Sequence, residues 1–272
     1  MKIKVTCLIL LAILLGCEEL TKNAFEEEKV TESLRTPKNI ILFCDMTTSL
    51  DSISISTLAQ YSRRLINQLP WGSKIEVYPI NNSTFSKAIF KEEIAPFPKS
   101  GLTSDVNKAK KLRYIKALQL EKEILKRYGY EKIDTINQYQ SCIITSLESI
   151  HGLLKSRKDN KNTRVVFFSD MVEQCLVSSA GPIYMCTNIK NRRPDKKEIL
   201  QKIEKKYNPD FNLKNLIDNR ISVVITSDKK EEHRCLLDKD LKEIWQKIFE
   251  KVGYSKEDFI SFHFNQRLPS FD

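Results

Sequence analysis

The stretch from Asn39 to Ser49, NIILFCDMTTS, constrains the fold of this chain more than any other. Five consecutive apolar residues lead into Asp45, which is typical of a strand buried on both faces of a parallel sheet. Ligands of open α/β folds bind where such strands end. The loop that follows offers only oxygen donors, from Asp45, Thr47 and Ser49, and hard divalent cations prefer oxygen. The sequence therefore predicts a candidate metal site at a sheet edge.

The N-terminal segment has the pattern of an export signal. Two lysines precede an apolar run from Val5 to Leu15, which is too short to cross a bilayer but suits a signal-peptide core. The run closes on Leu-Leu-Gly-Cys17, which resembles the lipobox of bacterial lipoproteins. That resemblance implies a signal peptide of residues 1–16, lipid on Cys17, and a membrane-anchored envelope protein facing the periplasm or the cell surface. The alternative is an ordinary secretory signal in which Cys17 is incidental.

Residues 17–37 are polar, rich in Glu and Lys, and without apolar periodicity, so we expect a flexible tether. The rest of the chain is long enough for one domain with a full core, which we place at residues 38–268. The formal charge of +10 falls to +8 without the two lysines of residues 1–17. The basic stretches at 108–113 and 190–197 contain no aromatic residues that could stack on bases, so we expect no nucleic-acid partner. A solvated surface, or attraction to anionic lipid or glycan, fits this charge better.

The chain contains seven cysteines, of which Cys7 leaves with the signal peptide and Cys17 carries the lipid. Five remain, so at least one is unpaired. Cys44 ends the first strand and is expected to be a buried thiol. Cys175 and Cys186 bracket a loop-like segment, and we predict a disulfide between them in an oxidising compartment. The sequence has no CxxC motif and its three histidines are scattered, so zinc has no support.

Apolar runs and helical periodicities alternate along the remaining sequence. This alternation predicts a doubly wound α/β fold with a mostly parallel sheet and helices on both faces. We expect strands at 74–80, 84–89, 164–170, 221–226 and 259–264, and helices at 52–68, 106–128, 141–150, 196–206 and 241–252. Residues 91–140 fit this alternation least well and are treated as an insertion. Within them, a stripe of Leu112, Ile115, Leu118 and Leu125 indicates either packing on the chain's own domain or a docking surface.

Two further loops could join Asp45 at the carboxyl edge of the sheet. Ser141 stands at the expected N-cap of a helix, and Asp170 follows the apolar strand VVFFS. The two carboxylates and three hydroxyls, with water, could complete six oxygens around Mg²⁺ or a similar ion such as Mn²⁺ or Ca²⁺.

The three loops together resemble the metal-ion-dependent adhesion site of the von Willebrand factor A (vWA) domain. The family's first loop reads Asp-x-Ser-x-Ser, and Asp45-Met46-Thr47-Thr48-Ser49 matches it with Thr in place of the first Ser. The second loop carries Thr before a helix beginning x-Ile-x-x-Ala-Leu, where this chain has Ser141-Cys142-Ile143-Ile144-Thr145-Ser146-Leu147. The third reads Ser-Asp-Gly, where this chain has Ser169-Asp170-Met171.

The resemblance implies a mechanism of binding rather than catalysis. The hydroxyls of such a site coordinate the ion directly, and Asp45 often acts through water. A carboxylate of a protein partner completes the coordination, because one position is left open and the ion stays attractive to an acidic side chain. The bulkier Met171 changes how the site opens.

Three alternatives remain. Asp45 and Asp170 could cap turns, with the nearby hydroxyls making only local hydrogen bonds. A haloacid-dehalogenase-like phosphatase also has an apolar strand ending in Asp, but Thr47 occupies the position of its general acid and cannot donate a proton in that role. The third is a metal-independent scaffold subunit of an envelope assembly that docks through residues 91–140.

Overall fold

A computed structural model describes residues 36–46, 52–80, 87–130, 141–157, 162–175, 181–186, 193–215, 221–225, 236, 238–255 and 260–264. Its main sheet has neighbouring strands parallel, except for the antiparallel pair of β3 with β2. The strand order is β3 (Phe90–Glu93), β2 (Lys74–Ile80), β1 (Asn39–Asp45), β4 (Thr163–Ser169), β7 (Ile221–Ile225) and β8 (Ile260–Phe264). A small antiparallel pair, β5 (Gln174–Cys175) and β6 (Ile183–Tyr184), lies apart from it.

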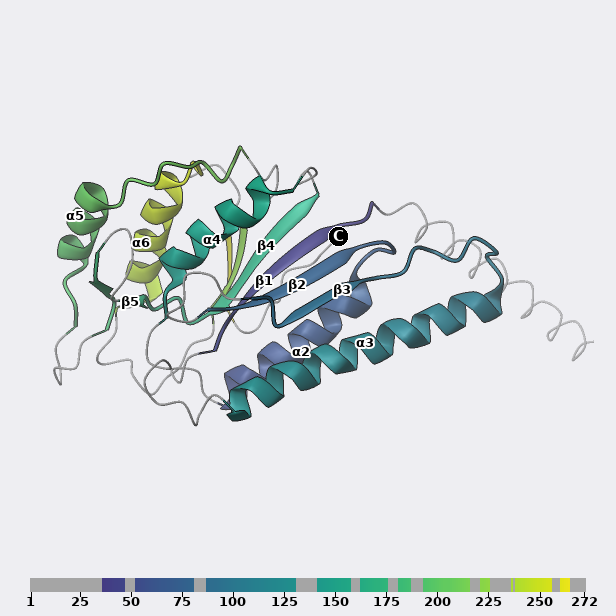
Figure 1. The fold of residues 1–272 in the computed structure, drawn as a ribbon. Helices are drawn as coiled ribbons and strands as arrows, with labels where there is room; N and C mark the ends of the chain where they lie inside the picture. Colours follow the sequence, from purple (N-terminus) through teal and green to yellow (C-terminus); the bar gives the residue numbers. More distant parts are fainter. Residues whose placement is uncertain are drawn as a thin grey trace, which may run out of the picture.

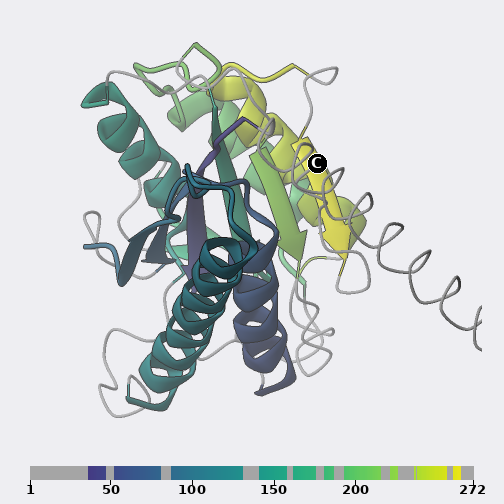
Figure 2. The same cartoon turned by 90° about the vertical axis from the view of Figure 1, so that its right-hand side faces the viewer.

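Helices cover both faces of the sheet (Figures 1 and 2). One face carries α2 (Ser52–Gln68) and α3 (Thr103–Tyr130), and the other carries α4 (Ile143–Lys155), α5 (Lys196–Lys206) and α6 (Asp238–Lys251). Strand β1 supplies both cores because its side chains alternate in direction: Ile40 and Leu42 pack toward α2, whereas Ile41 and Phe43 pack toward α4. The predicted fold class, a doubly wound and mostly parallel α/β fold, is confirmed.

The segment around residues 84–130 differs from the sequence prediction. The predicted strand at 84–89 lies partly outside the described residues, and the described edge strand is Phe90–Glu93, which runs antiparallel to β2. Helix α3 extends over Thr103–Tyr130 and lies alongside α2 (Figure 2). No helix of the described residues is long and apolar enough to cross a membrane.

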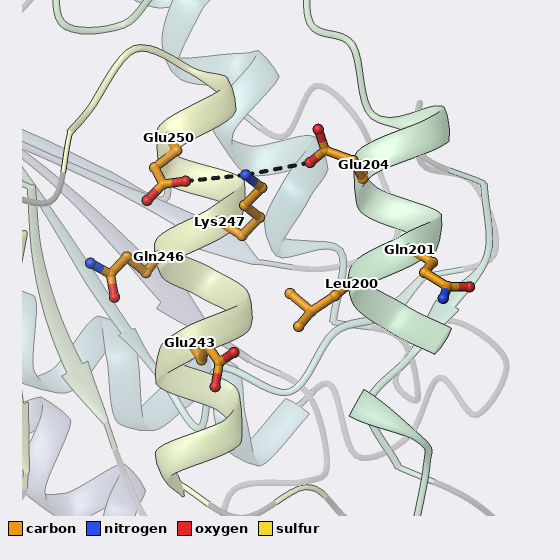
Figure 3. Close-up of a pocket in the computed structure, with 7 residues that line it drawn as sticks. All are labelled: Leu200, Gln201, Glu204, Glu243, Gln246, Lys247 and Glu250. Carbon is orange, nitrogen blue, oxygen red and sulfur yellow. Dashed lines mark ion pairs between the residues drawn. The ribbon is translucent and has the colours of Figure 1, made fainter. Parts of the chain in front are cut away.

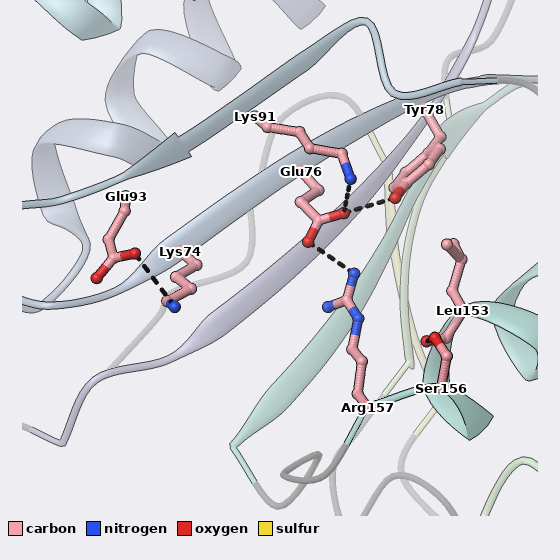
Figure 4. Close-up of polar contacts among 8 residues, drawn as sticks. All are labelled: Lys74, Glu76, Tyr78, Lys91, Glu93, Leu153, Ser156 and Arg157. Atoms are coloured by element: carbon pink, nitrogen blue, oxygen red, sulfur yellow. Dashed lines mark hydrogen bonds and ion pairs between the residues drawn. The ribbon is translucent and has the colours of Figure 1, made fainter.

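A polar network fastens the β3 edge to the rest of the sheet (Figure 4). Glu76 of β2 accepts hydrogen bonds from the Tyr78 hydroxyl at 2.5 Å and from Arg157, after α4, at 2.7 Å. Lys91 of β3 lies 3.3 Å from the same carboxylate. Burial alone raises the pKa of Glu76, but the Tyr78 hydrogen bond and the charges of Arg157 and Lys91 outweigh it and hold the pKa below its usual value.

The chain reverses its direction of winding between β1 and β4. From β1 it adds β2 and then β3 on one side, and it later adds β4, β7 and β8 on the other. Such a switch point separates the loops at the carboxyl ends of the two central strands, and ligands of doubly wound folds bind there. Asp45 ends β1 and Asp170 directly follows β4, so both predicted acidic residues lie at this point.

Candidate functional site

Asp45 is the centre of a buried polar cluster at the switch point. Its side chain is fully buried, and two hydroxyl groups from distant parts of the chain donate to it. Ser169 Oγ, at the end of β4, lies 2.7 Å from Asp45 Oδ2, and Ser141 Oγ lies 3.1 Å from the same oxygen. The structure thus brings together the first and second predicted loops, which are 96 residues apart.

Ser141 is held by the segment that precedes α4, and its role differs from the prediction. The N-cap residue of α4 is Cys142, whose side chain makes no capping hydrogen bond. The cap comes from Glu173 instead: its Oε2 accepts the backbone N–H of Ile143 at 2.7 Å and that of Ile144 at 3.1 Å. A carboxylate at this place also interacts favourably with the helix dipole. Ser141 is therefore left to donate toward Asp45.

A disulfide between Cys142 and Cys175 fixes the same helix end to the loop after β4, with Cα atoms 4.8 Å apart. The predicted pairing of Cys175 with Cys186 is wrong. Cys186 is disulfide-bonded as well, but to a cysteine outside the described residues. The reason for the error is spatial: the start of α4 and the β5 segment lie together at the switch point, although 33 residues separate their cysteines. Cys44 is a free, buried thiol as expected.

Glu173 is the functional residue that sequence reasoning missed. Its side chain is fully buried, and its Oε1 has no hydrogen-bond partner among the described residues. The pKa of Glu173 is raised to about 8, chiefly by burial and in smaller part by the charges of Asp45 and Glu148, against the lowering effect of the two backbone hydrogen bonds. A single acidic residue in the run MVEQC carries no signal that would distinguish it from a surface residue.

The third predicted loop keeps the backbone shape of a glycine despite carrying Met171. Met171 has a φ of 59°, in the left-handed region that favours glycine. Three contacts hold this turn: Met171 N–H donates to Ser169 Oγ at 2.9 Å, Val172 N–H donates to Asp170 Oδ1 at 2.9 Å, and Trp245 Nε1 donates to the Met171 carbonyl at 2.7 Å. Asp170 is partly exposed beside the buried Met171.

The described part of the predicted donor set fits a hard cation. Asp45 and Ser141 are within hydrogen-bond distance, Asp170 follows the neighbouring strand, and every donor atom is oxygen. Thr47 and Ser49 lie outside the described residues. Within the described ranges no three His, Cys, Asp or Glu side chains gather as a metal site, so a bound ion depends on two carboxylates supplemented by hydroxyls and water.

A groove between α5 and α6 is separate from this cluster (Figure 3). Its volume is about 500 Å³, and none of its lining residues belongs to the predicted site. Lys247 of α6 lies 3.4 Å from Glu204 across the groove and 3.4 Å from Glu250 on its own helix, and Lys196 pairs with Glu243 at 2.8 Å. Because its carboxylates are already paired with lysines, the groove has the character of a solvated helix–helix contact.

Known proteins resemble this chain in their three-dimensional structure and not detectably in sequence. No protein-family model matches the sequence, and no curated protein matches it. Similar solved structures include a von Willebrand factor type A protein from Catenulispora acidiphila, with 9% identity, a TM-score of 0.39 and coverage of 78% of this chain and 37% of that chain. Manganese-loaded TRAP from Plasmodium vivax has 12% identity and a TM-score of 0.36, covering 84% and 68%. The PilB minor pilin from Streptococcus sanguinis has 12% identity and a TM-score of 0.41, covering 85% and 57%.

The chain thus spans little more than a third of the first of these proteins, and identities this low bear on the fold alone. The assignment rests on the chain's own geometry. Its doubly wound sheet has the Asp45 loop and the Ser141 segment meeting at the switch point, with Asp170 on the adjacent strand end. The described part of the chain has a doubly wound α/β fold, and the loops in which the sequence resembles the von Willebrand factor A domain lie at its switch point.

Proposed function

We propose that this protein is a lipid-anchored component of a bacterial envelope whose vWA-like domain binds a protein partner through a divalent cation. Asp45, Thr47, Ser49, Ser141 and Asp170 would hold the ion, and the ion would supply a positive charge with one coordination position for an acidic side chain of the partner. The observation that carries this proposal is the contact between Ser141 and Asp45, two predicted ligand positions that are remote in sequence and 3.1 Å apart in space.

Two features of the third loop support the same proposal. The turn at Met171 has the backbone conformation that the family's glycine adopts freely, although a methionine there costs on the order of 1 kcal/mol of strain. Strained turns persist where surrounding contacts fix them. Here the hydrogen bond from Val172 N–H holds the Asp170 carboxylate next to the end of β4.

The direction of the chain is compatible with an anchor at Cys17. The described chain enters the domain at the amino edge of the sheet, where the Lys38 carbonyl accepts from Lys74 N–H at 3.0 Å. Asp45 lies at the opposite edge, at the far end of β1. A tether attached at the first edge leaves the candidate site free for a partner. We infer an envelope location from the Cys17 motif and this geometry.

We infer a binding role rather than an enzymatic one, because Thr47 stands where a haloacid-dehalogenase-like phosphatase needs its general acid. The second candidate function is a metal-independent scaffold that docks through residues 91–140, in which case a protein partner would cover the exposed apolar residues of α3.

Thermal unfolding with and without Mg²⁺ or Mn²⁺ tests the proposal. At a hundred times its Kd, an ion that binds only the folded state adds about 2.7 kcal/mol, which raises the melting temperature of a domain this size by roughly 5–10 °C. Asp45→Asn and Asp170→Asn should abolish the shift. Asp210→Asn removes the same charge at an exposed site and should keep it. If neither metal raises the melting temperature of the native chain, the scaffold function replaces this one.

A further inference from the structure

Helix α3 has two apolar faces, and among the described residues only one of them is packed against other elements. The inner face packs on α2 through the buried residues Val106, Ala117, Leu120 and Ile124. Arg113 reinforces this contact, because its guanidinium lies 3.8 Å from the Trp71 ring centroid and donates to the Asn67 carbonyl. The orientation of α3 is therefore fixed, and its opposite face is turned outward.

The outward face combines apolar and basic side chains. Ile115 lies at its centre, directly opposite the inner stripe at 100° per residue. Ile115 is 41% exposed, Leu112 52% and Leu125 45%, so large apolar surfaces meet solvent along several turns. Lys108, Lys111, Lys122 and Lys126 are exposed among them. We call this set, Lys108, Lys111, Leu112, Ile115, Lys122, Leu125 and Lys126, the outer face of α3.

No carboxylate lies near the centre of the outer face. Of the three acidic residues of α3, Asp105 and Glu123 are displaced by about 80° around the helix from Ile115, at the border of the face beyond Leu112, and Glu121 by about 120°. Glu121 is also engaged inward, in an ion pair with Arg63 of α2 at 3.1 Å. Helix α5 shows the contrast, because Glu198 and Glu204 are interspersed there with the lysines. A merely solvated helix face mixes both signs, as α5 does.

We propose that the outer face of α3 lies on an anionic lipid surface. A helix in a bilayer interface inserts its apolar side chains at the level of the acyl-chain boundary, while flanking lysines extend their charged ends to the phosphates. The outer face has this arrangement, and α3 is about 42 Å long, which gives a straight line of contact along the domain. Its charge complements anionic headgroups, each lysine strengthening attraction to them.

A protein partner is the other conceivable occupant, but the outer face is a single convex helix side rather than a groove. Proteins that bind a helix usually enclose a continuous row of its apolar side chains in a groove. On the outer face of α3, exposed lysines lie between the apolar side chains. The inference is independent of the metal site, which lies at the switch point and shares no residue with α3. It is also independent of lipid on Cys17, because it predicts a second contact with the membrane, made by the domain.

Tryptophan quenching on vesicles tests this contact. The full-length chain carrying Ile115→Trp is bound to phosphatidylcholine–phosphatidylglycerol vesicles (7:3) with brominated acyl chains, and the vesicle-bound fraction is collected by flotation. The native Trp71 and Trp245 are buried and give a constant background. We expect the fluorescence emission of the added tryptophan to shift to shorter wavelength and to be quenched by the brominated acyl chains. The matched control, Lys205→Trp on the exposed side of α5, should remain unquenched.

Charge variants then test whether the lysines of the outer face are needed for the contact with the vesicle. Lys108→Gln, Lys111→Gln and Lys122→Gln together, in the Ile115→Trp background, should lower the apparent affinity of the contact roughly a hundredfold. Lys197→Gln, Lys205→Gln and Lys206→Gln make the same charge change on α5 and should leave it unaltered. Absence of quenching on the anionic vesicles overturns the proposal and assigns the outer face to a protein partner. Quenching that survives the α3 triple substitution overturns it too.

Discussion

Replacing Glu173 by Gln should stabilise the protein at neutral and alkaline pH. Glu173 is fully buried against the start of α4, where its Oε2 accepts two backbone hydrogen bonds and its Oε1 accepts none from the described residues. Glutamine has nearly the same shape and keeps one oxygen to accept from Ile143 and Ile144. It removes the charge that is costly to bury.

The size of the effect follows from the pKa of Glu173, which burial raises from 4.5 to about 8. The folded protein binds this proton more tightly than the unfolded chain does. Its stabilising contribution is therefore complete below pH 4.5, falls between pH 4.5 and 8, and is constant above pH 8. The free energy of unfolding should fall by up to about 1.4 kcal/mol per pH unit in this interval. At pH 8, Glu173→Gln should be more stable than the native chain by about 4 kcal/mol.

Urea unfolding at pH 5.5, 7.0 and 8.5 measures this difference, with fluorescence of the buried Trp71 and Trp245 as the probe. The gap between variant and native protein should widen with pH. Glu148→Gln is the control, because Glu148 is near Glu173 and carries the same charge but is only half-buried. The reasoning is refuted if Glu173→Gln has the same pH dependence as the native chain, or is less stable at every pH.

Three further substitutions probe other contacts. Cys142→Ser with Cys175→Ser opens a 33-residue loop and should cost about 4 kcal/mol in the urea-unfolding free energy, provided mass spectrometry confirms the native pairing. Glu76→Gln should lower the free energy of unfolding by about 1–3 kcal/mol at pH 7. This loss should shrink as the pH falls, because the native carboxylate has a lowered pKa and its stabilising contribution disappears in acid. Equal losses at pH 4 and pH 7 would contradict this. Ile124→Ala should cost about 2–5 kcal/mol, whereas Ile115→Ala should cost less than about 0.5 kcal/mol, and equal costs would show that α3 is turned otherwise.

The central strands and the acidic residues that follow them can be predicted from the sequence because one physical signal specifies them. A strand buried on both faces needs an unbroken apolar run, so β1 and β4 are recognisable, and so are the polar residues at their ends. Asp45 and Asp170 were predicted in this way and Ser141 from its place before a helix; the structure joins Asp45 to Ser141 and places Asp170 on the neighbouring strand end. Their capacity to bind an ion stays a prediction.

The orientation of α3 could not be predicted, for a reason visible in its residues. Val106, Ala117, Leu120 and Ile124 form one stripe at helical spacing, and Leu112, Ile115, Leu118 and Leu125 form another. The sequence prediction singled out the second stripe, but the first packs on α2. Periodicity identifies an apolar face, and only the tertiary contacts of Arg113 and its neighbours decide which face is covered.

The contacts around Glu173 were also beyond sequence reasoning. A disulfide partner and a buried cap both depend on which loops meet at the switch point, and sequence separation does not report this. Cys175 was paired with a cysteine 11 residues away rather than with Cys142 for that reason. The edge strand β3 was not predicted because its sequence, FKEE, lacks the apolar character on which the strand prediction relied.

The most direct test of the metal proposal is anomalous X-ray diffraction from crystals soaked in Mn²⁺. The proposal predicts one anomalous peak at the switch point, within about 2.5 Å of at least one oxygen of Ser141, Thr47 or Ser49, with Asp45 and Asp170 contacting the ion directly or through water. The peak should be absent from Asp45→Asn crystals treated in the same way. A native crystal with Mn²⁺ at saturating concentration and no peak at Asp45, Ser141 and Asp170 would contradict the proposed metal-dependent function.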